Sequence, residues 1–140
     1  MTLQTWHGSC HCGRVRYEAE LDLSEPTTRC NCSICRKSRM WFATALGDGF
    51  RVTGGAEALA EYRWTPPGRA EPFLHFHFCR TCGIRTHGWG EHQSFGGRFT
   101  AVVLATLDDV PDDVLAAAPI ARIDGRHDRF DALPEDIRLL

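Results

Sequence analysis

The sequence predicts a mainly β fold, and three observations support this prediction. Short runs of residues alternate between apolar and polar side chains or are apolar throughout. Turn residues separate these runs, and only two short segments carry the signals of a helix. Of the 140 residues, 43% are hydrophobic and 24% are charged, which are ordinary values for a globular protein. A chain of this length suits one core, so we expect a single domain over residues 1–140.

Strands are predicted along most of the chain. They are expected at residues 14–21, 40–46, 50–53, 59–64, 72–78, 99–107 and 120–123. The clearest is 72–78, where the residues alternate, so that His75 and His77 share one face and the apolar residues between them share the other. If this strand runs straight into Cys79, His77 points the same way as that cysteine. His77 is then a partner of the cysteine, a proton-transfer group or a residue of the solvated face.

Two short helices and one long loop complete the prediction. The first helix covers residues 34–38, with Ser33 as its N-cap, and its free amides face the cysteines that precede it. The second lies within 108–118, where acidic residues fill the first turn and a proline follows the end. Residues 88–98 are rich in glycine and predict a long loop, a kind of segment that often carries function. Residues 126–140 are polar and are expected to be irregular.

The cysteines are the strongest chemical signal in the sequence. They form a triplet and two pairs: Cys30, Cys32 and Cys35; Cys10 and Cys12; Cys79 and Cys82. Structural zinc sites are closed by four protein ligands, whereas catalytic sites keep three and leave one position for water or substrate. We therefore expect two Zn²⁺ ions per chain: one structural, held by the two distant pairs, and one with an open position, held by the triplet. A histidine that closed the triplet would instead make both sites structural.

A glycine follows each cysteine pair. Gly13 comes after the first pair and Gly83 after the second. A chain that folds back around a metal needs a residue that tolerates positive φ, and the amide of that residue can then donate to a thiolate. A plain turn would also explain either glycine, but the repeat after both pairs favours the metal turn.

Charge and composition limit the classes of partner. The formal net charge is −2, and no strongly basic footprint is present, which argues against binding to nucleic acid. The amino terminus has no secretory signal and no stretch is long and apolar enough to span a membrane, so we expect a cytoplasmic protein without a membrane partner. In that reducing compartment, clustered cysteines bind metal or carry chemistry more often than they form disulfides.

The three cysteine clusters also identify a family. Residues 8–13, 30–35 and 79–83, in this order and at these separations, resemble the glutathione-dependent formaldehyde-activating enzymes, a family that includes centromere protein V. The resemblance is strongest over residues 8–109. It implies a β-tent-like fold of short antiparallel strands and the activity of a carbon–sulfur lyase. It also implies a structural zinc on Cys10, Cys12, Cys79 and Cys82 and a catalytic zinc on Cys30, Cys32 and Cys35.

Chemistry at an open zinc site is expected to involve sulfur. Three thiolates make a soft zinc, for which a substrate thiol is a natural fourth ligand. Binding lowers the pKa of that thiol, and the thiolate can add to an aldehyde to give an S-hydroxyalkyl adduct. We therefore expect a zinc-dependent carbon–sulfur lyase that acts on a small, glutathione-like thiol and an aldehyde such as formaldehyde. The alternative is a non-catalytic, zinc-stabilised binding module; an iron–sulfur protein fits the spacings less well.

Other residues are candidates for supporting roles. A carboxylate of the thiol could be held by one of four cations, Arg29, Arg36, Lys37 and Arg39. The candidates for proton transfer are His11, His77, His87, His92 and Glu91. Substrate choice is expected to depend on residues 88–98 and 124–128. The oligomeric state is not predicted by the sequence.

Overall fold

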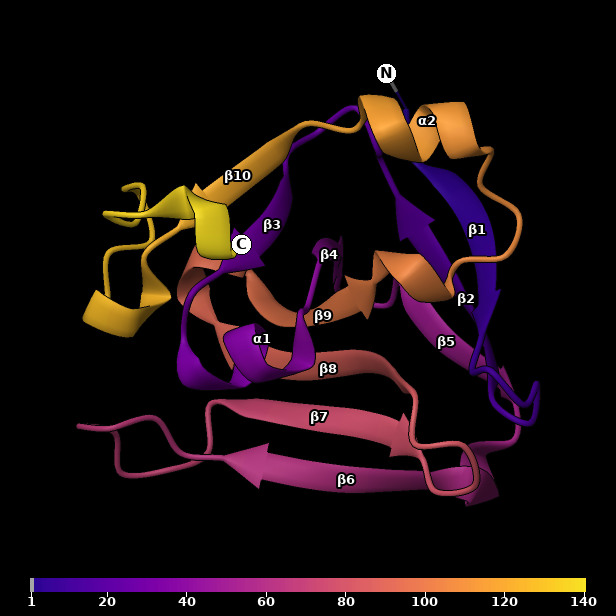
Figure 1. The fold of residues 1–140 in the computed structure, drawn as a ribbon. Helices are drawn as coiled ribbons and strands as arrows, with labels where there is room; N and C mark the ends of the chain where they lie inside the picture. The colour runs from indigo at the N-terminus through magenta and orange to yellow at the C-terminus, as the bar shows by residue number, and fades with distance from the viewer. Residues whose placement is uncertain (1) are drawn as a thin grey trace.

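The computed structural model describes residues 2–140 and shows the mainly β fold that the sequence predicts. A three-stranded antiparallel sheet forms the right-hand side of Figure 1. Its strands, in spatial order, are β1 (Gln4–Ser9), β2 (Arg16–Leu21) and β5 (Phe50–Gly54). The alternation of buried and exposed residues along β2 matches the alternation of apolar and polar residues in its sequence.

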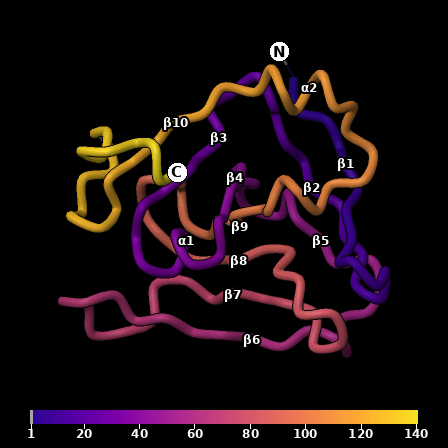
Figure 2. Tube along the Cα trace, in the orientation of Figure 1, coloured from indigo at the N-terminus to yellow at the C-terminus, as the bar shows by residue number. Residues whose placement is uncertain are grey.

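A seven-stranded sheet makes up the rest of the fold. Its strands, in spatial order, are β10 (Ile120–Ile123), β3 (Thr27–Cys30), β4 (Phe42–Leu46), β9 (Gly97–Val103), β8 (Arg85–His92), β7 (Leu74–Cys79) and β6 (Leu59–Trp64). Each neighbouring pair is antiparallel except β10 and β3, which are parallel. The expectation of antiparallel strands is therefore wrong at this edge, where the chain returns beside β3 after a long excursion (Figure 2).

The main hydrophobic core lies between the two sheets. Tyr17 and Ala19 of β2 pack in one cluster with Val102 of β9 and with Leu104, and all four are almost fully buried. The hydroxyl of Tyr17 forms a 2.6 Å hydrogen bond with that of Thr106, so the one polar atom of this large side chain is satisfied. This core fixes the small sheet against one face of the large sheet.

The opposite face of the large sheet carries a second apolar cluster. Phe76 of β7 and Ala101 of β9 pack there with Met40 and with two of the cysteines, Cys30 and Cys35. Helix α1 (Ser33–Ser38) lies over this face in Figure 1. Both faces of β9 are covered along its second half, where Ala101, Val102 and Val103 are all apolar instead of alternating. The cysteine triplet is thus on the outer face of the sheet, away from the main core.

The predicted loop at 88–98 is wrong, because these residues form most of a β-hairpin. Strand β8 runs to His92, a short 3₁₀ turn (Gln93–Phe95) follows, and β9 begins at Gly97. The glycines inside β8 are required by close packing. A Cβ atom added to Gly88 would lie 2.9 Å from the ring of Phe76, and one added to Gly90 would lie 2.7 Å from a backbone carbonyl.

Several predicted boundaries also change. Helix α1 begins at Ser33 after Cys32 as its N-cap, so Ser33 is not the cap, and no side chain caps this helix. The second helix, α2 (Asp112–Ala117), is shorter than predicted but has the expected acidic first turn. Strand β9 ends at Val103, and a 3₁₀ turn follows it.

Three further boundaries differ from the prediction, and two short turns interrupt a segment expected to be irregular. Strand β4 begins two residues later than predicted, β2 begins at Arg16, and β7 begins at Leu74. The carboxyl-terminal segment contains two 3₁₀ turns, Gly125–His127 and Ile137–Leu139. Within residues 2–140, every helix is too short or too polar to cross a bilayer.

Candidate metal centres

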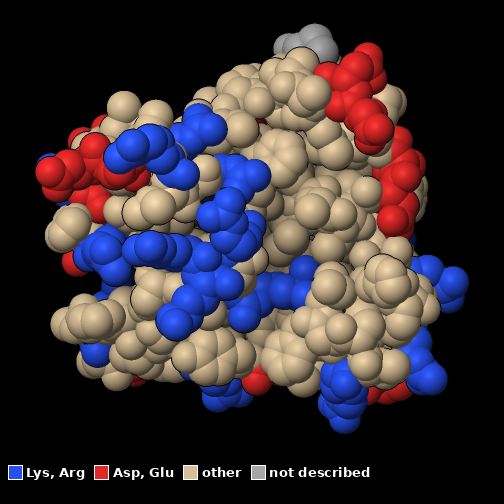
Figure 3. All heavy atoms as spheres, in the orientation of Figure 1, with Lys and Arg blue, Asp and Glu red and all other residues tan. Residues whose placement is uncertain are grey.

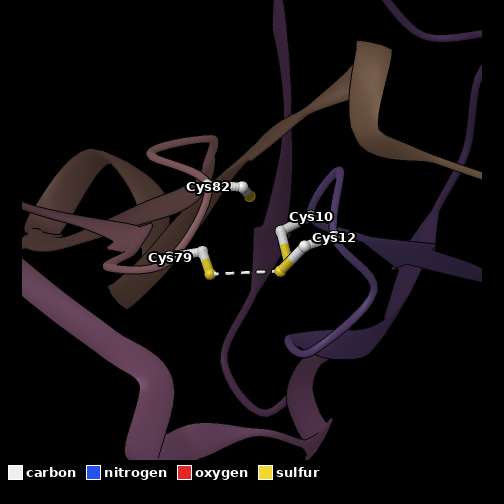
Figure 4. Close-up of side chains that lie close together, drawn as sticks. All are labelled: Cys10, Cys12, Cys79 and Cys82. Atoms are coloured by element: carbon white, nitrogen blue, oxygen red, sulfur yellow. Dashed lines mark hydrogen bonds between the residues drawn. The ribbon is translucent and has the colours of Figure 1, made fainter.

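The two distant cysteine pairs meet at one edge of the molecule. Cys10 and Cys12 lie in the turn that connects β1 to β2, and Cys79 and Cys82 lie where β7 ends, facing them (Figure 4). The sulfur of Cys12 is 3.6 Å from that of Cys10 and 3.7 Å from that of Cys79, and all four sulfurs lie within 4.8 Å of one another. A metal ion here would join segments that are 67 residues apart.

The turns at this cluster follow the prediction in one respect and differ in another. Gly13 and Gly83 adopt positive φ angles of 80° and 77°, as expected of turns around a metal. Their amides, however, donate to the carbonyl oxygens of Cys10 and Cys79 instead of the sulfurs, because these bonds close the turns. The prediction that they donate to thiolates is therefore wrong.

Other backbone amides donate to the sulfurs instead. The amide of Val15 donates to the sulfur of Cys10 at 3.3 Å, and the amide of Thr81 donates to the sulfur of Cys79 at 3.4 Å. Hydrogen bonds from the backbone of Cys12 and Ile84 lower the pKa of the Cys82 thiol to about 6. Such amide donors stabilise thiolates, which are the form of cysteine that binds zinc.

The three remaining cysteines gather on the outer face of the large sheet. Cys30 ends β3, Cys32 is the N-cap of α1 and Cys35 lies within this helix. Their sulfurs also lie within 4.8 Å of one another, and Cys30 and Cys35 are buried. The short helix brings Cys32 and Cys35 to the same side, because residues three apart lie on one helix face.

Hydrogen bonds concentrate negative charge on Cys30. Bonds from the thiols of Cys32 and Cys35, together with the amides of Cys32 and Gly125, lower the pKa of Cys30 to about 3. Bonds with the other two thiols and burial raise the pKa of Cys35. Without a metal, the contacts within the triplet thus favour the thiolate form of Cys30 and the protonated forms of Cys32 and Cys35. Binding of a divalent cation would release these protons.

Residues 2–140 supply no fourth ligand to the triplet. Among residues 2–140, no histidine, carboxylate or further cysteine contributes a ligand atom to this group of three sulfurs. In the described residues, no histidine is therefore placed to close the site, as the alternative prediction requires. Three ligands leave one position of a tetrahedral metal for another molecule.

A carboxyl-terminal loop that sequence reasoning did not connect with the triplet lies beside it. A Cβ atom added to Gly125 would lie only 2.3 Å from the sulfur of Cys30, so the loop backbone is in direct contact with this cysteine. Neighbouring Asp124 is fully buried, and its carboxylate accepts hydrogen bonds from Asn31, His127 and Arg129. The hydrogen bonds from Asn31, Arg129 and His127 lower the pKa of Asp124 to about 2.

Asn31 ties this loop to the triplet from the other side. It lies between two of the cysteines in the chain, and its side-chain oxygen accepts a 2.9 Å hydrogen bond from the amide of Arg126. Its position between Cys30 and Cys32 was the only sequence signal for this role. The segment 124–128, expected to influence substrate choice, is thus placed beside the triplet, whereas residues 88–98 belong to the sheet.

The predicted basic residues lie unevenly around the triplet. Arg29, Arg36 and Arg39 line a narrow cleft of about 10 Å³ together with Cys30 and Cys35, and Leu139 and Leu140 also line it. Lys37 is exposed and does not line it. Figure 3 shows that lysine and arginine side chains gather over β10, β3 and α1, while acidic side chains gather near α2.

Arg85 is a cation that sequence reasoning missed. It comes from β8, is half-buried, and lies 4.5 Å from the centre of the Phe76 ring on the triplet's face of the sheet. One of its terminal nitrogens is buried without a hydrogen-bond partner in the described chain. Burial is the main cause that lowers its pKa. Nothing in the sequence around Arg85, which follows Cys82 by three residues, distinguishes it from other charged residues near a turn.

The predicted proton-transfer residues do not gather at the triplet. His11 and Glu91 are exposed, and His92 forms a hydrogen bond with Ser94. His77 and His87 stack on one another between the two sheets, with ring centres 4.8 Å apart. Burial lowers the pKa of His87 to about 3, so this ring is neutral. The histidine connected to the triplet's surroundings is His127, through Asp124 and Asn31.

Comparison with known proteins decides the family. The sequence model of the family described as "Glutathione-dependent formaldehyde-activating enzyme" matches residues 5–123. The chain belongs to this family. The seven cysteines of this family member all lie within the matched residues.

Two relatives show how far the likeness extends. A protein of Halomonas elongata, named provisionally as a glutathione-dependent formaldehyde-activating enzyme, is 38% identical over 85 residues, which are 54% of this chain and 50% of that protein. The alignment thus spans about half the length of this curated relative. A crystal structure of a Rhodobacter sphaeroides protein shares 35% identity with a TM-score of 0.63, and the match covers 82% of this chain and 99% of that one.

Proposed function

We propose that this family member is a zinc-dependent carbon–sulfur lyase. It would form or cleave the S-hydroxyalkyl adduct of a glutathione-like thiol and a small aldehyde, with formaldehyde as the expected aldehyde. The observation that supports this proposal is a set of three cysteine sulfurs without a fourth protein ligand, next to a cleft lined by arginines. The proposal also assigns the protein to one domain over residues 1–140 and to the cytoplasm, where its thiols stay reduced.

The donor sets of both cysteine clusters fit zinc. Each cluster offers only sulfur, a soft ligand that binds zinc better than it binds hard cations. The sulfurs of each cluster also lie close enough together to hold one ion. Cys10, Cys12, Cys79 and Cys82 would hold a structural ion, and Cys30, Cys32 and Cys35 a catalytic one. When bound at the triplet, zinc supplies a soft Lewis acid that takes the sulfur of a substrate thiol and lowers its pKa.

The arginines around the cleft suit a thiol that carries carboxylates. Burial is the main cause that lowers the pKa of Arg29. The positive charges of Arg39 and Arg122 lie close enough to lower this pKa further. Three guanidinium groups near one another therefore form a positive surface beside the triplet. A glutathione-like tripeptide has two carboxylates, and guanidinium groups bind carboxylates through paired hydrogen bonds.

The carboxyl-terminal residues would have to move for such a substrate to enter. The cleft at the triplet has a volume of about 10 Å³, enough for one water molecule. Arg39 donates a 3.1 Å hydrogen bond to the carbonyl of Leu139, and this contact is exposed. A substrate carboxylate that binds Arg39 would replace this bond, so binding and opening of the cleft would occur together.

The chain's own groups account for the proton in the reaction. Addition forms a bond between the thiolate sulfur and the carbonyl carbon, and the carbonyl electron pair moves to oxygen, which takes a proton. Cleavage reverses these movements. We assign this proton to His127, which is largely exposed and is oriented by the buried carboxylate of Asp124 at 2.9 Å. Arg85 would balance the negative charge that three thiolates leave around a divalent ion.

Exchange spectroscopy by NMR tests the proposed activity. Zinc-loaded protein should accelerate the interconversion of glutathione and formaldehyde with S-hydroxymethylglutathione, and the Cys32→Ser variant should lose this acceleration while remaining folded. Arg39→Ala should weaken substrate binding, whereas Lys37→Ala, which removes a cation outside the cleft, serves as the matched control. If the zinc-loaded protein leaves the exchange rate unchanged with several thiols and aldehydes, the proposed activity is wrong and the protein is a zinc-stabilised binding module.

A further inference from the structure

A second cavity lies between the two sheets. It has a volume of about 510 Å³, and its lining includes Phe50 and Val52 of β5 and His87, Trp89 and Arg98 of the large sheet. This volume is within the range of cavities that bind small molecules. No residue of either cysteine cluster lines it.

This cavity and the cysteine triplet are on opposite faces of the large sheet. Trp89 is paired with Thr100 across β8 and β9, and both line the cavity. The next pair, Gly88 and Ala101, faces the other way, because successive residues of a strand alternate between faces. Ala101 packs with the cysteines of the triplet. A ligand in the cavity would therefore be separated from the proposed reaction by the sheet itself.

Aromatic side chains give the cavity a rigid wall. His77 of β7 stacks on His87 of β8 with an interplanar angle of 3°, and the ring of Phe50 lies 4.3 Å from that of His87 between ring centres, tilted by 35°. Beside this stack, His75 lies on Trp89 with an interplanar angle of 4°. Each stack is set by residues that face one another across β7 and β8, so the wall is formed before any ligand binds.

Arg98 gives the cavity a positive charge. Its guanidinium group lies 4.2 Å from the centre of the Trp89 ring. Within residues 2–140 it forms no ion pair, whereas Arg51, which also lines the cavity, is paired with Glu18. Asp48 lines the cavity as well and forms no ion pair with either arginine. Arg98 is therefore the cation in this cavity that remains available to an anion.

From these features we propose that the cavity binds a small organic carboxylate with a flat, apolar body. The aromatic wall, Val52 and Leu59 suit the body, and the guanidinium group of Arg98 suits the carboxylate, which it can bind through two hydrogen bonds. His77 has a buried Nε2 atom without a partner in the described chain, and a ligand oxygen that reached it would satisfy it. This site is independent of the proposed lyase activity.

Titration of the zinc-loaded protein with benzoate, followed by protein NMR, tests this site. Benzoate should shift resonances of residues around Trp89 and leave those around the triplet unchanged, and benzyl alcohol should bind at least tenfold more weakly. Arg98→Gln should weaken benzoate binding by roughly 10–100-fold, the effect of losing a hydrogen-bonded charge pair. Val52→Trp, which fills the cavity, should abolish binding.

Controls separate this site from the triplet. Cys32→Ser should bind benzoate as the native protein does, and thermal unfolding should show that both cavity variants remain folded. The inference is overturned if millimolar benzoate causes no shift, if benzyl alcohol binds equally well, or if Arg98→Gln binds benzoate with unchanged affinity. It is also overturned if Cys32→Ser removes the binding, because the ligand would then occupy the triplet.

Discussion

Substitution of Gly125 by alanine should loosen the metal site at the triplet without unfolding the protein. Gly125 does not adopt a positive φ angle, so alanine suits its backbone conformation. The added Cβ atom, however, would lie 2.3 Å from the sulfur of Cys30 and 3.6 Å from the Cβ of Cys32. The substitution thus acts on the position of one proposed ligand and not on the conformation of the chain.

The size of the effect follows from this distance. Non-bonded heavy atoms pack at about 3.5–4.0 Å, so the alanine methyl group and the Cys30 sulfur must separate by more than about 1 Å. The loop has little freedom to move, because the buried carboxylate of Asp124 holds it through Asn31 and Arg129. Zinc–ligand distances tolerate about 0.2 Å. We expect zinc affinity at the triplet to fall by about 10–100-fold, the usual effect of disturbing the surroundings of a ligand.

Competition with a chromophoric zinc chelator measures this effect. The native protein should release its two zinc ions in separate steps, and Gly125→Ala should weaken only the step assigned to the triplet. Gly54→Ala is the matched control, since its added Cβ would meet only the flexible end of Arg16 at 3.3 Å. Native affinity in Gly125→Ala, or equal weakening of both steps, would refute the assigned contact between the loop and Cys30.

Three other predictions follow from the same structure. Cys79→Ser should remove a proposed ligand that joins distant segments, and so unfold the domain or lower its melting temperature strongly. Cys32→Ser should retain a native-like circular dichroism spectrum, and equal loss of structure in both variants would contradict the proposed division of roles. Arg85→Met should weaken zinc binding at the triplet by about tenfold and Arg85→Lys by less, because the charge and not the shape is required. His87 should make the free energy of unfolding depend on pH, because its pKa of about 3 in the folded chain lies below the ordinary 6.5. Between these two values the unfolded chain binds a proton at this histidine and the folded chain does not, so stability is lost as pH falls from about 6.5 toward 3. The loss is at most about 1.4 kcal/mol per pH unit, and thermal unfolding between pH 4.5 and 7.5 should show a shallower slope in His87→Gln than in the native protein.

Local patterns in the sequence were sufficient for much of the fold. Strand β6 and strand β10 have the predicted bounds, because alternating or apolar runs between turn residues determine short strands locally. The cysteines lie in the two predicted groups, but short spacing explains only the triplet and each separate pair; the meeting of the two distant pairs was predicted from the number of ligands that zinc takes.

The errors arose where distant segments determine the local structure. Glycines at 88 and 90 suggested a loop, but the ring of Phe76 and the backbone of Phe73 require them inside a strand, and their positions in the chain do not reveal this. By contrast, the pairing of β7 with β6 is regular through Cys79, so the predicted alternation along β7, with His77 on the side of Cys79, is retained. The contact of Gly125 with Cys30 depends on the parallel pairing of β10 with β3, which no local pattern predicted.

Cobalt substitution tests the open position of the triplet most directly. The protein should bind two Co²⁺ ions, and titration with glutathione should change the sulfur-to-cobalt charge-transfer bands of one ion only, saturating at one thiol per chain. Cys32→Ser should abolish this change. A spectrum that stays constant at saturating glutathione, or one in which both ions respond alike, would contradict the account.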